Sequence, residues 1–106
     1  MTAKQVQEAV NFCVKENFNR AMYEYQTKGY LSRKQLHSCT AWVYETENYY
    51  ILLSFETFVA SINKEDAKLF DALRMVYGYT STSSLHISKF WHDYGHGEKF
   101  TFRRIK

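Results

Sequence analysis

The densest group of side chains that could do chemistry lies in residues 77–95, where a hydroxyl-rich run leads into aromatic residues and histidines. Five consecutive hydroxyls occupy residues 80–84, although the start of a helix needs only one as its N-cap. Free backbone amides and several hydroxyls together favour an anion or a directional contact. This surplus predicts a recognition surface. Its predicted residues are Tyr79, Thr80, Thr82, His86, Lys89 and Trp91.

The spacing of the histidines bears on whether the chain holds a metal. His92 and His96 stand four apart, which places two imidazoles on one helix face, but zinc needs at least one further ligand. Gly95 interrupts that helix, and His86, His37 or a cysteine would have to complete the set without any Cys-x-x-Cys pair. We therefore predict no metal and no cofactor, and two surface histidines at a helix end.

Nucleophilic catalysis needs a base within hydrogen-bond reach of the nucleophile and a third group to orient it. Cys39 and His37 would lie about 7 Å apart on one strand. Ser83 or Ser84, just before His86, are better placed as helix caps. The chain contains no Gly-x-Ser-x-Gly elbow and no Gly-rich phosphate loop. These patterns predict a protein that is not an enzyme.

The net charge of +3 falls entirely at the C-terminal end, since residues 1–84 carry equal numbers of basic and acidic side chains. Nearby rings suit either stacking on single-stranded bases or anchoring a protein interface. Because the basic excess is small and acidic residues are interspersed, we rank protein binding above nucleic-acid binding. The basic residues of this end are Lys89, Lys99, Arg103, Arg104 and Lys106; the first four are the predicted nucleic-acid or anion contacts.

Residues 3–26 show the three- and four-residue spacing of an amphipathic helix. Thr2 and Gln5 have the spacing of a capping box, and Gly29 is placed to end the helix. The predicted buried face contains Val6, Ala9, Val10, Cys13, Ala21, Met22 and Tyr25. The predicted solvated face contains Lys4, Glu8, Lys15, Glu16, Asn19, Arg20 and Glu24.

The middle of the chain predicts an antiparallel sheet. Residues 39–44 and 49–55 are rich in β-branched and aromatic side chains and are separated by a polar turn. A third run, 57–62, ends at a second polar turn. Residues 67–77 have two interpretations: Leu69, Leu73 and Val76 fit a helix, whereas the alternation over 69–73 fits a strand. We favour the strand, mainly on the resemblance described below.

After Gly78, the hydroxyl run offers several N-caps for a second helix over residues 85–94, closed by Gly95. Leu85, Ile87 and Phe90, with Trp91 or Tyr94, should form its buried face. Alternation of Phe100, Phe102 and Ile105 with charged neighbours predicts a last short strand.

Two segments carry a resemblance to a known group. Residues 53–60 fit the pattern Ser-aromatic-x-Thr-x-Val-Ala. Residues 78–83 with 86–90 are similar to a Tyr-Ser-x-Thr-Thr-x-x-His-Ile-x-x-Phe run, with Thr80 and Ser83 where that pattern has Ser and Thr. The stretch 52–95 thus resembles small uncharacterised proteins of phages, prophages and gut-bacterial mobile elements. The resemblance implies a mobile-element origin and a sheet-then-helix core. It also implies an accessory protein that binds and inhibits or modulates a host macromolecule, such as a defence nuclease complex, in the manner of anti-CRISPR proteins.

A length of 106 residues suits one domain with one modest core. No run approaches the roughly 18 apolar residues that span a bilayer, and the start lacks the basic-then-apolar order of a signal peptide. We therefore expect Cys13 and Cys39 to be reduced, buried thiols in the bacterial cytoplasm.

Together these patterns predict a single α+β domain over residues 1–106. It should contain an N-terminal helix, an antiparallel sheet of three to five strands, a second helix near the C-terminus and a short final strand. The side chains predicted to be buried together are Trp42, Ile51, Leu53 and Val59 with Val10, Cys13 and Met22 of the first helix.

Overall fold

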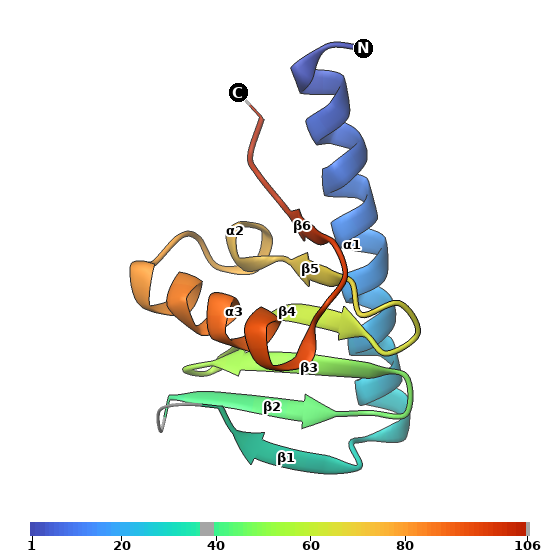
Figure 1. The fold of residues 1–106 in the computed structure, drawn as a ribbon, viewed down its shortest axis with the longest axis vertical. Coiled ribbons are helices and arrows are strands. Elements are labelled where there is room, and N and C mark those ends of the chain that lie inside the picture. The colour runs from blue at the N-terminus through green and yellow to red at the C-terminus, as the bar shows by residue number, and fades with distance from the viewer. Residues whose placement is uncertain (37–39, 106) are drawn as a thin grey trace.

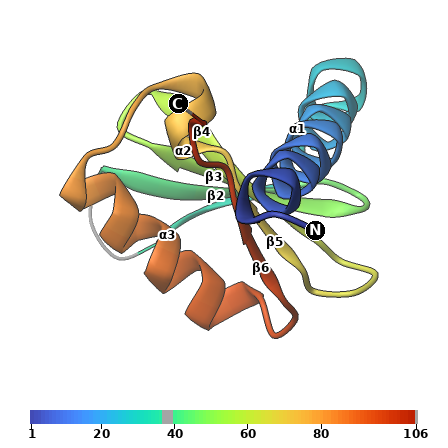
Figure 2. The same ribbon diagram turned by 90° about the horizontal axis from the view of Figure 1, so that it is seen from above.

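The computed structural model describes residues 1–36 and 40–105, which form a six-stranded sheet with a long helix on each face (Figures 1 and 2). This arrangement confirms the predicted α+β class, with its first helix, second helix and short last strand. The elements are α1 (Ala3–Lys28), β1 (Ser32–Gln35), β2 (Ala41–Glu45), β3 (Tyr49–Ser54), β4 (Thr57–Asn63), β5 (Leu69–Asp71), α2 (Leu73–Val76), α3 (Ser81–Tyr94) and β6 (Lys99–Thr101).

The first helix begins at the predicted capping box. The Thr2 hydroxyl accepts the Gln5 backbone N–H, and the Gln5 side chain accepts the Thr2 backbone N–H. Gly29, with φ of 74°, ends the helix in a conformation that glycine adopts without strain. The buried face differs from the prediction: Val14 and Phe18 are its centre, whereas Val6 is 47% exposed. The apolar stripe therefore starts later along α1 than its spacing suggested.

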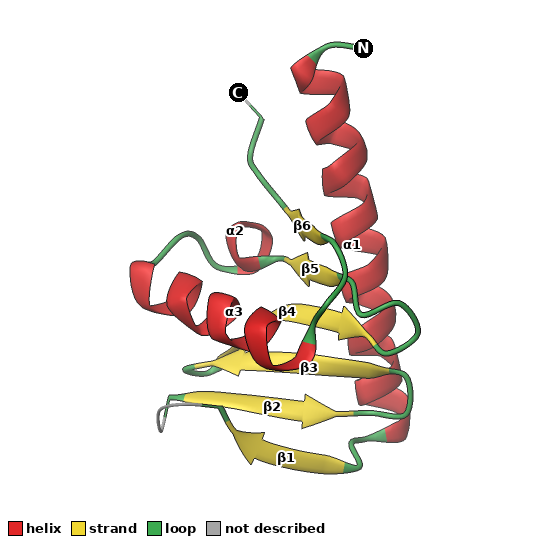
Figure 3. Cartoon of the chain, viewed as in Figure 1, coloured by secondary structure: helices red, strands yellow, loops and turns green. Residues whose placement is uncertain are grey.

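The strands lie in the sheet in chain order, as Figure 3 shows. β1 to β5 pair antiparallel, which confirms the predicted meander of β2, β3 and β4. β6 pairs parallel to β5 and is reached by a crossover through α2 and α3. The sheet has one strand more than the predicted maximum, because β1 was missed. That strand, Ser-Arg-Lys-Gln, lies at an edge with mostly exposed side chains, so its sequence carries no apolar signal.

One irregularity interrupts the pairing of β3 with β4. Leu52 lies opposite Ala60, but Leu53 lies opposite Phe58, so Val59 is an extra residue in β4. As a result, the chain neighbours Val59 and Ala60 both belong to the core beneath α3. This bulge adjoins the hairpin that joins the two strands.

The sheet separates two cores, which corrects the prediction of one shared cluster. Val59 belongs to the core under α3, whereas Ile51 faces α1 on the opposite side. Trp42 and Leu53 are only partly buried, next to Ile51. The buried residues under α3 are Ala41, Val43, Leu52, Val59, Ala60, Ile62, Leu69, Leu73, Ile87 and Phe90. Those under α1 are Val14, Phe18, Ala21, Tyr44, Ile51, Phe70 and Ala72.

For residues 67–77, the strand interpretation is right for the first half, which forms β5, and the helix interpretation is right for the second half, which forms the single turn of α2. The Asp71 carboxylate accepts the Leu73 backbone N–H (3.0 Å) where the strand ends. In α3, Ser83, His86, Ile87 and Phe90 are buried. Leu85 is 70% exposed, so its prediction as a core residue is wrong.

Candidate functional site

A pocket of about 640 Å³ opens between the tip of the β3–β4 hairpin and the start of α3. Both elements approach the same end of the molecule in Figure 1. We call this the hairpin pocket. It is lined by Thr40, Ser54, Phe55, Glu56, Thr57, Val59, Tyr77, Thr80, Thr82 and Ser83.

Thr80 is the N-cap of α3, and its hydroxyl accepts the Ser83 backbone N–H (3.2 Å). The Ser83 side chain is therefore not needed as a cap and instead lies 2.9 Å from the Ser54 hydroxyl. Ser54 Oγ is also 2.8 Å from His86 Nδ1. Ser54, Ser83 and His86 are 2%, 4% and 7% exposed, so this cluster joins α3 to β3 as a buried polar contact.

The two-residue loop of the hairpin holds Phe55 at φ of 58°. A bulky side chain is a genuine outlier in this region, which costs an L-residue roughly 1–2 kcal/mol and favours glycine. The Phe55 backbone N–H donates to Thr40 O (2.7 Å), which helps to hold the turn. Its ring lies 5.7 Å from the His86 ring and remains 50% exposed at the rim of the pocket.

The structure brings only part of the predicted recognition surface to this pocket. Thr80 and Thr82 line it, and His86 lies beneath it in contact with Ser54 and Phe55. The expectation that His86 is exposed is wrong, because the side chain spans the space between α3 and the hairpin. The hydroxyls of Thr80 and Thr82 can donate hydrogen bonds to, or accept them from, a group bound in the pocket.

The other predicted contacts lie elsewhere. Lys89 forms an ion pair with Asp93 one turn further along α3 (3.4 Å). Trp91 lies near the loop after α3, where its Nε1 donates to Gly97 O (3.3 Å) and Lys99 Nζ lies 5.7 Å from its ring.

Tyr79, Arg103 and Arg104 meet in a second hollow, of about 450 Å³, together with Arg74 and Gly78. We call this the arginine hollow. The Arg74 guanidinium stacks 4.5 Å from the Tyr79 ring centre. The charges of Arg74 and Arg103 also act on the carboxyl of Asp71. Burial raises the pKa of this carboxyl, and the hydrogen bond from the Leu73 backbone N–H opposes that rise, followed by the charges of Lys99, Arg74 and Arg103.

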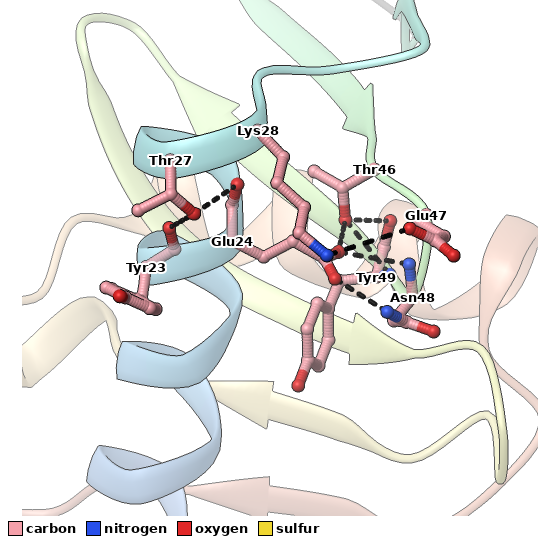
Figure 4. Close-up of polar contacts among 8 residues, drawn as sticks. All are labelled: Tyr23, Glu24, Thr27, Lys28, Thr46, Glu47, Asn48 and Tyr49. Carbon is pink, nitrogen blue, oxygen red and sulfur yellow. Dashed lines mark hydrogen bonds and ion pairs between the residues drawn. The ribbon is translucent and has the colours of Figure 1, made fainter.

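A third polar cluster, made by Glu24, Thr46, Asn48 and Tyr49, joins α1 to the β2–β3 turn (Figure 4). The Glu24 carboxylate accepts the Thr46 hydroxyl (2.5 Å), the Asn48 backbone N–H (3.0 Å) and the Asn48 side-chain amide (2.6 Å). Burial alone would raise the pKa of Glu24, but these hydrogen bonds outweigh it and lower the pKa. We call this the Glu24 cluster.

Within the described part of the chain, no three His, Cys, Asp or Glu side chains lie together as a metal site would require. His92 is largely exposed beside Asp93 (3.1 Å), and His96 is exposed. Cys13 is partly buried. His37 and Cys39, which entered the predictions for zinc and for a nucleophile, lie outside the described residues, as does Lys106.

Comparison of the chain with protein-family models, curated proteins and solved structures finds no match. None of the described helices has the length and apolar character needed to cross a bilayer.

Sequence reasoning missed Ser54 and Phe55 as members of the site. Tyr77 lay within the predicted segment 77–95 but was not among its predicted contact residues. Ser54 and Phe55 were assigned only to a strand, and the pocket exists because the hairpin tip meets α3, a contact between positions about thirty residues apart. One signal was present: a two-residue hairpin loop usually contains Gly, Asn or Asp, and Phe55-Glu56 does not.

Proposed function

We propose that this protein is a non-enzymatic binding domain that recognises a partner protein through the hairpin pocket and its rim. The observation that carries the proposal is Phe55. Its backbone conformation favours glycine, yet the position holds a large ring that is half exposed. Backbone strain of this kind persists at sites where the side chain serves a contact.

The surroundings of Phe55 have the composition of a protein interface. Tyr77 lines the pocket and is 66% exposed, and Leu85 is 70% exposed one turn along α3 from Thr82. Exposed aromatic anchors beside a hollow with hydroxyl donors and acceptors are typical of the centre of a binding surface. Neither exposed side chain is needed for the core.

The resemblance of residues 52–95 to phage and mobile-element proteins supports a more specific proposal. The partner would be a host macromolecular complex in the bacterial cytoplasm, and binding would inhibit or modulate it by covering a functional surface. A defence nuclease complex is the target that this proposal favours, in the manner of anti-CRISPR proteins. A partner of that kind would be captured as protein, independently of nucleic acid.

A pull-down from bacterial lysate tests the proposal, with and without nuclease treatment. Tyr77→Ser should abolish capture, and Tyr23→Ser on α1 is the matched control because Tyr23 is 67% exposed. A photo-crosslinking residue at position 77 should label the same partner. Equal loss in both variants, or loss of capture after nuclease treatment, would refute a protein partner at this pocket.

A further inference from the structure

The arginine hollow combines three guanidinium groups with one exposed aromatic ring. Arg74 and Tyr79 come from the segment after β5, and Arg103 and Arg104 from the segment after β6. Among the residues that the structure describes, none of these arginines forms an ion pair with a carboxylate within 4.0 Å. Three neighbouring cations repel one another. The buried Asp71 carboxyl, on which Arg74 and Arg103 act by charge, offsets part of that repulsion, and an anion in the hollow would relieve more of it.

Hydrogen bonds and stacking hold the backbone of Arg103 and the side chains of Arg74 and Arg104 before any ligand arrives. Asn11 of α1 accepts the Arg103 backbone N–H (2.9 Å) and donates to the Arg103 carbonyl (2.7 Å). Arg104 Nε donates to the Arg74 carbonyl (3.3 Å), while the Arg74 guanidinium stacks on Tyr79. Such fixed positions reduce the entropy that binding must otherwise overcome.

The presence of Tyr79 favours a nucleotide over other anions as the ligand of this hollow. A phosphorylated peptide needs only the arginines, whereas a nucleotide presents a phosphate and a base together. The Tyr79 ring is 55% exposed in the same hollow as the guanidinium groups. Gly78, which precedes Tyr79, has a φ of 126°, a conformation that glycine adopts without strain.

We propose that the arginine hollow binds single-stranded nucleic acid, with a phosphate on Arg103 and Arg104 and a base against Tyr79. This site is separate from the hairpin pocket and does not depend on the proposed function. Of the four nucleic-acid or anion contacts predicted from the sequence, the site keeps Arg103 and Arg104 and leaves out Lys89 and Lys99. Arg74 and Tyr79 join them in the hollow. Weak binding with little sequence preference is expected, since stacking and phosphate contacts do not read base edges.

Fluorescence anisotropy with a labelled 20-nucleotide oligo(dT) at low salt tests the site. The variant Arg74→Gln/Arg103→Gln/Arg104→Gln should bind at least about tenfold more weakly. The log–log slope of its salt dependence should fall by about 0.7–1.4, since each phosphate that Arg103 and Arg104 contact contributes roughly 0.7. The matched control, Lys15→Gln/Lys28→Gln/Lys34→Gln, loses the same charge from exposed positions that do not line the hollow, and it should bind within about twofold of the parent. If the triple arginine variant does not fold, Arg103→Gln/Arg104→Gln replaces it.

The ring is tested by Tyr79→Ala, which should weaken binding about tenfold, whereas Tyr79→Phe should leave it within about twofold. The proposal would be overturned by no binding of the parent at low salt, by equal loss in the lysine control, or by preference for a phosphorylated peptide over the oligonucleotide. Competition by dTMP at the same nucleotide concentration should be weak. Equal competition would show a site for a free nucleotide and would also overturn binding of a strand.

Discussion

The Glu24 cluster and the hairpin pocket both join a helix to a hairpin through polar side chains, but they differ in strain and exposure. At the Glu24 cluster, one carboxylate accepts hydrogen bonds from Thr46 and Asn48, and no residue of the cluster has a positive φ. At the hairpin pocket, a similar polar contact through Ser54 is overlaid by a strained phenylalanine and exposed rings. The first cluster is accounted for by folding, whereas the second has features that folding does not require.

The largest effect should come from the floor of the hairpin pocket. Val59 is 1% exposed, and Val59→Ala should lower the free energy of unfolding by about 2–3 kcal/mol through lost burial and a residual cavity. Leu53→Ala is the comparison, and its partial burial predicts a smaller loss. Urea denaturation measures both. A loss under about 0.5 kcal/mol for Val59→Ala would show that Val59, at the floor of the pocket, is not part of the packed core.

Ser54→Ala should cost about 1–2 kcal/mol, because it removes the hydrogen bonds to Ser83 and His86 from a buried site. Ser84→Ala on α3 is the control, since Ser84 is next to Ser83 in the chain but has no side-chain hydrogen bond in the described structure. Thermal and urea denaturation should separate the two variants. Equal stability would mean that the buried serine does not join α3 to β3.

Glu24→Gln should cost about 1 kcal/mol at pH 7, reduced by the solvent exposure of the cluster. The pKa of Glu24 is lowered in the folded state, so its ionised form stabilises the protein above the ordinary value of about 4.3. That stabilisation is lost as the pH falls through the lowered pKa. The stability difference between parent and variant should therefore disappear toward pH 3. A difference that persists unchanged at acid pH would show that the charge of Glu24 is not its source.

The smallest effect on stability is expected for Phe55→Gly, within about 0.5 kcal/mol of the parent, because relief of the strained turn offsets the lost ring contacts. Phe55→Ala, which keeps the strain, should be about 1 kcal/mol less stable than Phe55→Gly. Both variants should lose partner capture. If Phe55→Gly still captured the partner, the binding surface would have to lie elsewhere than at this rim. The strained phenylalanine would then no longer distinguish the hairpin pocket from the Glu24 cluster.

The predictable parts of the fold were those with a local cause. The Thr2–Gln5 capping box, the Gly29 stop and the Thr80 N-cap depend on neighbours within a few residues. The division into two cores was not predicted. Val59 and Ile51 are both apolar strand residues, but the bulge at Val59 and the alternation of side chains along β3 place them on opposite faces of the sheet. β1 was missed for the opposite reason, since an edge strand of polar residues has no periodic apolar signal.

The candidate sites divide in the same way. The surplus hydroxyls of residues 80–84 pointed to Thr80 and Thr82, which line the hairpin pocket. The sequence could not show that Ser83 would pair with Ser54, or that Arg74 would join Arg103 and Arg104, since both groupings arise from contacts between distant segments. Trp91 was included by proximity in sequence, but its position along α3 directs it to Gly97.

The two hydrogen bonds between Asn11 and the backbone of Arg103 join positions 92 residues apart. During synthesis, α1 emerges long before the segment that it will hold. Its residues Val14 and Phe18 stay uncovered until Phe70 of β5 and Phe100 of β6 pack on them. Late, non-local closure of this kind slows folding and exposes the early segments to other chains. A ribosome-bound chain lacking residues 99–104 should therefore resemble a chaperone substrate more than a folded domain, and the arginine hollow would be among the last features to form.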